Sequence, residues 1–543
     1  TNNVQYNTVY LNASSTSATF GTAGIRFPTS GTQDFRNNLV VNTSTAGTAG
    51  FTVALRRAAS GTNGTPPSTL STTTDYNLYY AGAASASNLL YGEGTGTLTN
   101  PIQTLAAYKA LMGLLSPPRE QNAKAELPAT FTLATYFASV VGTDAGFLHL
   151  GTAPTQAEAG GVEITGLTED YDLPTARSGP YPITPTPSNG GGQNPDIGAD
   201  EGDYTPRDVT GPAIAYTLLG PGASSLPSRT LTATITDPSG VDVTMSGRPL
   251  IYFRKGTMGA FVSAPATSSM GNSYTFTITY ASVGGVMSGD VIQYYVAAQD
   301  NAAPANPGTN PSGGSGTTPP GATAPGTLSQ FSIIQGYAGT LNVGPTETLT
   351  SLTAAGGLFA ALNAGALTGN LTVNITGDIS IEDGANALKP LAEDGGANFS
   401  ITIQPSAATL WTISGAIAGG SNNGIRFTGA DRVTVDGRFG GSGRYLLFRN
   451  TNATGTAPVF VAQQEAQNIT LRNLIIEGSG TSSAGALVFL GTSQTAVMDG
   501  ISIPIGTGIG NDFFTLRECQ LRNGAAGLPV TAFYSNGSTL SLG

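Results

Sequence analysis

The sequence predicts an all-β chain: the end portion of a right-handed parallel β-helix, an immunoglobulin-like β-sandwich, and the beginning portion of a second parallel β-helix. One observation is a short phrase that recurs at residues 35–41, 471–476 and 516–521, near both ends of the chain and not in the middle. A second is the composition, because 74 glycines punctuate segments rich in Thr, Val, Ile and Tyr. Irregular β-rich repeats with Gly, Asn and Ser turns between them are typical of stacked solenoid coils.

Composition excludes several classes of function. Only 10% of the residues are charged and the net charge is −11, with four lysines among 22 basic residues. No basic stripe exists, which argues against a nucleic-acid partner and against a polybasic membrane contact. The longest apolar stretch, residues 356–369, is diluted by Ala and Gly and is too short to insert into a membrane. The single Cys519 excludes an internal disulfide framework and a CxxC metal site.

Length and composition also suggest a setting. A chain of 543 residues predicts about three or four domains. It begins at Thr1 without Met or a signal peptide, so we expect a processed product or an internal segment. Low charge and richness in Thr, Ser, Gly and Asn favour an extracellular or cell-surface location.

Residues 1–205 are predicted to be the end portion of the first solenoid. Apolar and polar side chains alternate through the first 60 residues, as expected for short strands. Residues 101–115 have the apolar spacing of one short helix, with Pro101 near its start. A Pro-, Gly- and Ser-rich stretch at 178–194 predicts an extended loop.

A different module is predicted at residues 206–300. Its strands are longer, at 229–236, 250–254, 273–280 and 290–300, and they lack cysteine. This pattern predicts an immunoglobulin-like or fibronectin-type sandwich. Residues 301–330 are rich in Pro, Gly and Ser and are predicted to be a linker.

Residues 331–543 are predicted to be the beginning portion of the second solenoid. The best helix candidate of the chain, residues 353–367, directly precedes the first predicted strand, and we expect it to cap an open coil edge. Triplets of the type Ile-Thr-Ile recur at 401, 433, 469 and 514, at intervals of 32, 36 and 45 residues. These intervals exceed a coil of about 20 to 25 residues, so we expect further strands between the triplets.

Eight segments carry a resemblance to a known class of proteins. Together they resemble the large β-helix and Ig-like repeat proteins that Bacteroidetes-type bacteria export to their surface, often through type IX secretion. The resemblance implies surface display and a role in modular stalks or adhesins, and it carries no catalytic residues. The segments are NTVYLN (7–12), NLYYAG (77–82), PDIGADE (195–201), TDPSG (236–240), GDVIQYYV (289–296), GGLFAA (356–361), DRVTVDG (431–437) and GRYLLFRN (443–450).

An enzyme is the main alternative, because parallel β-helices also host polysaccharide lyases and hydrolases. Such chemistry needs a proton acceptor or two carboxylates about 5 to 10 Å apart. The only histidine, His149, lies between two leucines, which favours a structural role. Asp431 and Asp436 bracket one predicted strand, and Asp378 and Asp383 bracket another, at positions where Asp commonly forms a turn. We therefore predict that the chain has no catalytic residues and no organic cofactor.

One acidic cluster has the composition of a Ca²⁺ site. Its carboxylates fall within eight residues, and oxygen ligands suit this ion. The alternative is a solvated acidic turn that closes the first solenoid, which the lack of EF-hand spacing favours. The cluster comprises Asp196, Asp200, Glu201 and Asp203, with Asp170 and Asp172 expected nearby.

Two further residue classes have a functional and a structural interpretation. Aromatic side chains could form a sugar-stacking surface for surface glycans, although a place in the core is the stronger expectation. The Asn of each recurring phrase is predicted to stack in an amide ladder, and the Arg to pair with carboxylates of neighbouring coils. The aromatic candidates are Tyr79, Tyr80, Tyr294, Tyr295 and Trp411.

The sequence predicts a structural, adhesive function based on self-assembly. The chain starts and stops within a strand pattern, so we expect copies or adjacent repeats to stack head to tail into a stalk, fibre or filament. A glycan-binding or polysaccharide-degrading β-helix protein is the alternative. The predicted assembly residues are Val4, Tyr6, Tyr10, Phe533, Tyr534, Leu540 and Leu542.

Overall fold

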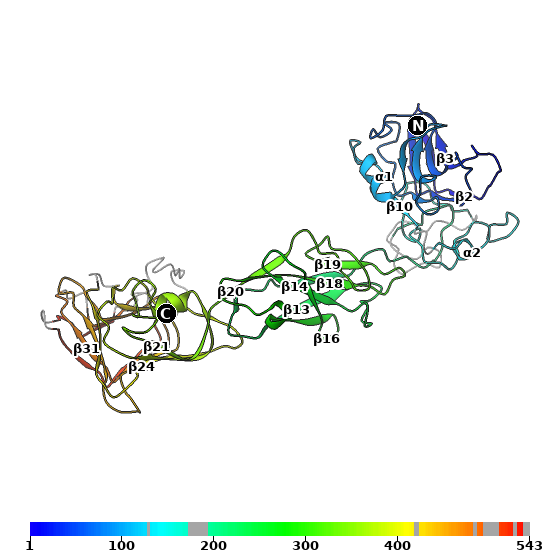
Figure 1. Ribbon diagram of the computed structural model, residues 1–543. Helices are drawn as coiled ribbons and strands as arrows, with labels where there is room; N and C mark the ends of the chain where they lie inside the picture. Colours follow the sequence, from blue (N-terminus) through cyan, green and yellow to red (C-terminus); the bar gives the residue numbers. More distant parts are fainter. Residues whose placement is uncertain are drawn as a thin grey trace. The chain divides into compact units, whose positions relative to one another are not determined.

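The computed structural model describes residues 1–126, 131–171, 194–417, 423–481, 486–491, 510–524 and 529–535. Within these residues the chain is nearly all β, and it divides into two compact units (Figure 1). The first unit comprises residues 1–211 with two short loops, 237–240 and 300–306. The second comprises the remaining residues from 212 onward.

The first unit is a parallel β-solenoid whose coils each contribute strands to separate sheets. The first coil pairs in parallel with the second, strand by strand, and the second pairs with the third. Thus β1 (Asn2–Gln5), β2 (Thr8–Leu11) and β3 (Thr22–Phe27) stack on β4 (Gln33–Arg36), β5 (Leu39–Asn42) and β6 (Thr52–Arg57), and these are followed by β7 (Leu78–Tyr80) and β8 (Asn88–Glu93).

The remaining elements of the first unit follow the third coil. Strand β9 (Thr99–Ile102) turns back antiparallel to β8, and β10 (Lys124–Ala125) continues the parallel sheet after β7. Helix α1 (Leu105–Met112) lies within the predicted 101–115 and is capped by Thr104, whose hydroxyl accepts from Ala107 N. Its buried face packs into the core of the unit, and a four-residue helix, α2 (Leu133–Tyr136), follows.

The middle of the chain, in the second unit, holds two largely antiparallel sheets that share one apolar core. Their inward side chains alternate along each strand, as β13 shows with Leu231, Ala233 and Ile235 buried between exposed threonines. One sheet contains β11 (Ala213–Tyr216), β13 (Ser228–Thr236), β17 (Ser273–Thr279) and β16 (Ser268–Met270). The other contains β12 (Gly222–Ala223), β20 (Ser329–Ile334), β18 (Val291–Gln299), β14 (Leu250–Lys255), β15 (Val262–Pro265) and β19 (Pro307–Asn310).

The linker prediction for residues 301–330 is wrong. Strand β19, which contains a proline, pairs antiparallel with β18, and Ser329 already belongs to β20. Polar groups of the intervening loop are also tied to the sheet, because Thr318 N donates to the Gln299 side chain. Proline is tolerated in a strand at a sheet edge, where its missing N–H is not needed, so composition alone misassigned this segment.

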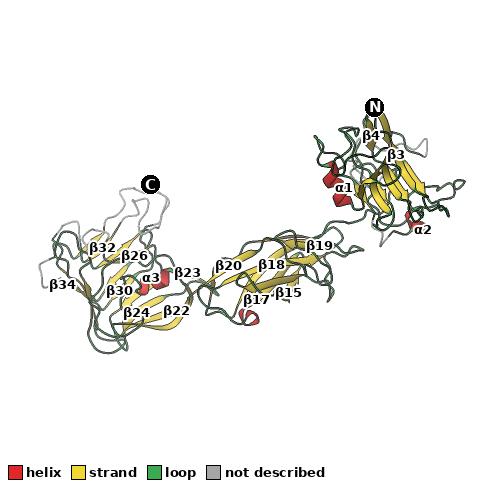
Figure 2. Ribbon diagram, turned by 45° about the horizontal axis from the view of Figure 1, so that its top comes forward, coloured by secondary structure: helices red, strands yellow, loops and turns green. Residues whose placement is uncertain are grey.

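The second solenoid also consists of parallel coils, shown with its strands in yellow in Figure 2. The recurring triplets lie in four neighbouring strands of one sheet, so each interval of 32 to 45 residues is a single long coil. The expected strands between the triplets exist and form two further sheets. The sheets are β21 (Gly336–Val343), β22 (Ala366–Ile375), β24 (Ile401–Pro405), β27 (Val433–Asp436), β30 (Thr470–Arg472) and β33 (Thr515–Arg517), with β23 (Ala392–Glu393) beside β22; β25 (Trp411–Gly415), β28 (Leu446–Asn450), β31 (Ile475–Gly478) and β34 (Gln520–Asn523); and β26 (Ile425–Thr428), β29 (Phe460–Gln463), β32 (Val488–Leu490) and β35 (Phe533–Ser535).

A short helix, α3 (Leu358–Asn363), lies within the predicted 353–367. It buries Leu358, Phe359 and Leu362 in the core of the second solenoid. The prediction that residues 1–200 and 340–543 contain the same kind of fold is confirmed, because both blocks stack parallel strands coil upon coil.

The recurring phrase marks a backbone corner. Asn37, Asn473 and Glu518 each follow an arginine and have φ of 55°, 52° and 56°, in the left-handed region. The two shorter echoes occupy another position, because Asn450 and Asn523 end the next strand of the coil. The full phrase and its shorter echoes therefore lie at two different corners of the coil, although their sequences are similar.

Candidate functional sites: coil edges and buried carboxylates

An asparagine ladder runs through the first solenoid at one corner. Asn7 Nδ2 donates to Asn38 Oδ1 at 2.9 Å, and Asn38 Nδ2 donates to Asn77 Oδ1 at 2.9 Å. The backbone N–H groups of Asn7 and Asn38 donate to the same two oxygens. The ladder prediction was one residue out of phase, because the Asn of the phrase, Asn37, instead bonds with its side chain to the backbone of Val162.

The ladder continues from Asn77 to a buried carboxyl group. Asn77 Nδ2 donates to Glu120 Oε1 at 3.1 Å, and the hydroxyls of Tyr79 and Tyr108 donate to the same oxygen. Oε2 of Glu120 has no hydrogen-bond partner, and the residue is fully buried. Burial raises the pKa of Glu120 to about 8, and the nearby charge of Asp75 adds to that increase. A protonated carboxyl group at neutral pH therefore terminates the ladder.

The first coil has an open edge within the described residues. Strands β1, β2 and β3 each pair with one neighbour only, in the following coil. The predicted assembly residues Val4, Tyr6 and Tyr10 lie on or next to this edge and are half-buried. Two of them also have partners inside the unit, since the Tyr6 hydroxyl donates to Val162 O at 2.8 Å and Tyr10 packs edge-on against Phe137.

The last described coil ends in the same way. Strands β33, β34 and β35 each pair with the preceding coil only. Phe533 and Tyr534 are 43% and 37% exposed, which leaves their rings partly open to a partner. The other two predicted assembly residues, Leu540 and Leu542, lie outside the described residues.

The acidic cluster predicted to bind Ca²⁺ is split by the structure. Asp196 is fully buried and accepts from Ala159 N and Gly202 N, and Glu201 accepts from Asp196 N. Asp200 instead accepts from the Tyr204 hydroxyl, and Asp203 is exposed. Asp170 is buried, and Asp172 lies outside the described residues. The Ca²⁺ assignment stays a prediction.

A carboxylate that sequence analysis did not single out joins this cluster. Glu158 is 8% exposed and accepts from Tyr204 N at 3.0 Å. Burial raises the pKa of Asp196, and the neighbouring charges of Glu201 and Glu158 raise it further. The hydrogen bonds from backbone N–H groups hold the carboxylates in a turn, as the alternative interpretation expects. The turn is not solvated as that interpretation supposed, because Asp196, Asp200 and Glu201 are all buried.

The residues weighed as catalytic are engaged in structural contacts. The sequence pattern around His149 predicted an apolar strand, but the residue lies outside any strand, with Nδ1 3.4 Å from Asp200 Oδ2. Asp436 accepts both Arg438 and Arg472; burial opposes its charge, but these bonds outweigh it and lower the pKa of Asp436. Asp378 and Asp383 accept backbone N–H groups at 2.7 and 2.8 Å.

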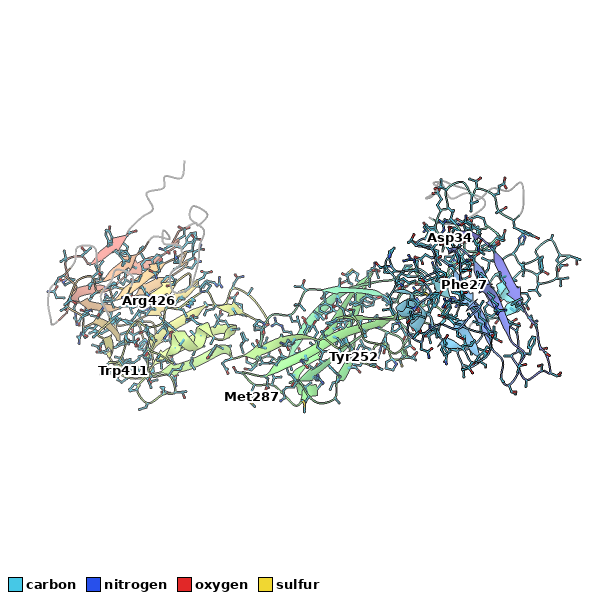
Figure 3. All side chains as sticks on the ribbon, turned by 90° about the horizontal axis from the view of Figure 1, so that it is seen from above. Phe27, Asp34, Tyr252, Met287, Trp411 and Arg426 are labelled. Carbon is cyan, nitrogen blue, oxygen red and sulfur yellow. The ribbon has the colours of Figure 1, made fainter. Side chains whose placement is uncertain are left out.

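The aromatic candidates are core residues. Tyr79, Tyr294 and Tyr295 are at most 1% exposed and Tyr80 is 9% exposed. Trp411 is half-buried and packs against the core of the second solenoid (Figure 3). These five residues therefore provide no exposed aromatic row for sugar stacking.

Arginine–carboxylate pairing between coils is confirmed in the second solenoid. Glu477 in β31 lies between Arg449 of the preceding coil and Arg522 of the following one, with both pairs at 2.5 Å. In the first solenoid Arg36 pairs within its own strand, with Asp34 at 2.7 Å. Glu477 thus links three successive coils of the second solenoid. The first solenoid also has such a pair between coils, because Arg57 of β6 lies 2.9 Å from Glu93 of β8.

Comparison with protein-family models and with curated proteins found no match for this chain. No helix among the described residues combines the length and the apolar character that a bilayer span requires.

Proposed function

We propose that this chain is a structural segment of an extracellular, cell-surface stalk, fibre or filament with an adhesive role. The observation that supports this most directly is the pair of unpaired coil edges. Every sheet of the first solenoid begins at β1, β2 or β3, and the sheets of the second end at β33, β34 or β35. Unpaired strand edges are templates for further pairing.

The open edge formed by β1, β2 and β3 has an acceptor available for another coil. Asn7 is exposed, and no donor to its Oδ1 is found among the described residues. In the coils that follow, this oxygen accepts a side-chain amide and a backbone N–H. An incoming coil would repeat the strand spacing of about 4.8 Å, and little chain entropy would be lost because both surfaces are preformed.

Head-to-tail addition of this kind does not close on itself. The last described coil, with strands β33, β34 and β35, stacked on β1, β2 and β3 of a neighbour would propagate as a filament. The neighbour is a second copy or an adjacent repeat of a longer polypeptide. Matching the corners places Leu516 above Val4 and Leu521 above Val9, so that apolar positions stay in phase.

The other modules fit a spacer. The two-sheet region agrees with an immunoglobulin-like sandwich, since its inward faces share one core. Helix α3 supports a capping role, because its Asn363 bonds to Ala387 O and Lys389 N beside the first coils. The resemblance to surface proteins of Bacteroidetes-type bacteria supports export and display. A non-enzymatic role is supported by the structural contacts of Asp436, which is held by two arginines.

A groove in the first unit favours glycan binding as a second function. Its volume is about 340 Å³, and its walls carry no ionisable group other than the Tyr80 phenol. Hydroxyl and amide side chains without formal charge suit a neutral sugar. The lining includes Asn42, Thr43, Ser44, Thr45, Tyr80, Ser87 and Asn88.

Edge pairing can be tested by removing one outward N–H group. Asn2 N and Tyr6 N donate towards the second coil, so alternation along β1 directs Asn3 N to the open edge. We expect wild-type protein to form particles that lengthen with concentration in electron micrographs, and Asn3→Pro to shorten them. Asn3→Ala, which keeps the N–H, is the matched control. A wild type that stays monomeric at every concentration would refute self-stacking.

A further inference from the structure

Three aspartates from separate segments converge in the first unit. Asp208 follows the first solenoid, Asp237 follows β13, and Asp300 follows β18. One carboxylate oxygen of each lies within 4.8 Å of the others. Asp300 is 1% exposed, whereas the side chains of Asp208 and Asp237 are half-buried.

Two of these carboxylates use one oxygen and leave the other without a donor. Asp208 Oδ1 accepts the N–H and the hydroxyl of Thr210, at 3.0 and 2.9 Å. Asp237 Oδ1 accepts the N–H and the hydroxyl of Ser239, at 2.8 and 2.7 Å. The Oδ2 atoms of both residues are closed off from solvent and have no hydrogen-bond partner. A buried carboxylate oxygen without a partner is destabilising, so a shared proton or a bound cation would be stabilising there.

The third carboxylate is fixed from the other side. Asp300 accepts backbone N–H groups of Ala302 and Asn306 on Oδ1 and the Asn306 amide on Oδ2. Asn306 Nδ2 also donates to the backbone carbonyl of Asp208 at 3.2 Å. The loop after β18 is thereby held against the segment that carries Asp208, which positions the oxygens before any ligand binds.

The cluster carries three formal negative charges without a basic partner. No lysine or arginine among the described residues forms an ion pair with Asp208, Asp237 or Asp300. Like charges at this separation, with two oxygens shielded from water, repel one another. Either a proton shared between two carboxylates or a bound cation would relieve the repulsion.

We propose that Asp208, Asp237 and Asp300 form a Ca²⁺ site. Calcium takes oxygen ligands at about 2.3–2.6 Å, so ligands on opposite sides of one ion lie up to about 5 Å apart, whereas Mg²⁺ allows only about 4.2 Å. Three carboxylate oxygens that all lie within 4.8 Å of one another can contact one Ca²⁺ ion, and this ion accepts the irregular geometry that three separate segments offer. Bound Ca²⁺ supplies the missing partner for both Oδ2 atoms and ties three chain segments together. This site is separate from the Asp196 cluster and does not depend on filament formation.

The test is calorimetric titration of chelator-treated full-length chain with CaCl₂, in parallel with thermal unfolding. We expect one site with a dissociation constant of about 10⁻⁴ M or tighter, and a higher melting temperature with Ca²⁺. Asp237→Asn and Asp300→Asn should each weaken this binding at least tenfold. Asp383→Asn, which changes an exposed aspartate with the same kind of turn hydrogen bond, is the control and should bind as the wild type does.

Asp208→Asn distinguishes a lost ligand from a misfolded chain. Its amide would donate to Asp237 Oδ2, so we expect a higher melting temperature without Ca²⁺ and no further rise when Ca²⁺ is added. A wild type that binds no Ca²⁺ would overturn the proposal in favour of a shared proton. Binding that persists unchanged in both Asp237→Asn and Asp300→Asn would also overturn it, because the ion would then occupy another site.

Discussion

The two solenoids turn the same corner with different side chains. In the first, the residue after the left-handed position is Asn7, Asn38 or Asn77, and the amides bond from coil to coil. In the second, the equivalent residues are Leu474, which is fully buried, and Cys519, which is half-buried. The backbone angles agree, with φ between 52° and 60° in both solenoids.

A second corner is built alike in both solenoids. Asn42 and Asn450 are fully buried, and each donates its amide to a carbonyl beyond the corner at 2.9 Å, Val53 O or Pro458 O. Each also accepts the N–H of the residue two positions later. The comparison teaches that coil geometry tolerates either polar or apolar stacking at one corner while another corner keeps its amide.

The largest expected effect on stability comes from exchanging the side chains at the first corner, Asn in the first solenoid and Leu in the second. Asn38→Leu would leave Val4 O and the Asn7 donors without partners, and we expect it to destabilise the first unit by about 2–4 kcal/mol. Leu474→Asn would bury an amide without a ladder, with a loss of similar size in the second solenoid. Hydrogen exchange of peptides spanning 36–42 and 474–478 measures each effect locally.

The control for this exchange is Asn3→Leu, which changes an exposed asparagine of the first coil and should alter stability by less than about 0.5 kcal/mol. Equal protection of residues 36–42 in Asn38→Leu and the wild type would show that the ladder contributes nothing to stability.

A smaller effect, which depends on pH, is expected at the end of the ladder. Glu120 has a pKa of about 8 in the folded chain against 4.5 as its ordinary value, mainly because of burial. Between these values the folded chain binds more protons than the unfolded chain, so stability is fully present below pH 4.5 and falls as pH rises towards 8. Urea unfolding of the first unit should show a loss of roughly 2–4 kcal/mol between pH 5 and pH 8.

Glu120→Gln should remove this dependence, because glutamine keeps the accepting oxygen and has no proton to lose in this range. Glu163→Gln, an exposed change in the same unit, should leave the pH profile as it is in the wild type. Identical profiles for wild type and Glu120→Gln would show that the carboxyl group does not govern the pH dependence.

The smallest expected change in stability tests backbone strain at the corner that both solenoids share. Glu518 has φ of 56°, a region that L side chains other than Asn rarely adopt, so Glu518→Gly should stabilise the second solenoid by about 0.5 kcal/mol. Asn473→Gly, at the same corner of the preceding coil, should change stability little, because Asn tolerates this region. Melting temperatures of the two variants provide the measurement, and a larger gain at Asn473 would contradict the explanation by strain.

The sequence predicted where the strands of each coil lie better than it predicted which polar side chains bond between coils. The triplets beginning at Ile401 and Val433 fall in neighbouring strands of one sheet because their apolar side chains must all face one core. The phrase containing Asn37 located a corner correctly, but composition could not say which of two adjacent asparagines turns inward. The spacing of Asn7, Asn38 and Asn77, which equals the strand spacing between coils, was the signal that could have found the ladder.

Other features had no local sequence signal. Glu120 joins the ladder from 43 residues beyond Asn77, and Glu158 meets Asp196 from 38 residues away, so only the folded chain brings them together. The same holds for Asp208, Asp237 and Asp300, which are spread over almost a hundred residues. Long-range contacts between polar side chains leave no periodic pattern in the sequence.

The column of asparagines in the first solenoid has a direction and one defined end, at Glu120. Asn38 and Asn77 each give and receive a side-chain hydrogen bond, whereas Asn7 only gives one, so the column can grow by one residue for every coil added before Asn7. Glu120 receives from Asn77 on Oε1, and its Oε2 has no hydrogen-bond partner, so no further bond leads onward from this residue. The carboxyl group therefore acts as a chain terminator, and polar stacking at this corner can be lengthened from one end only.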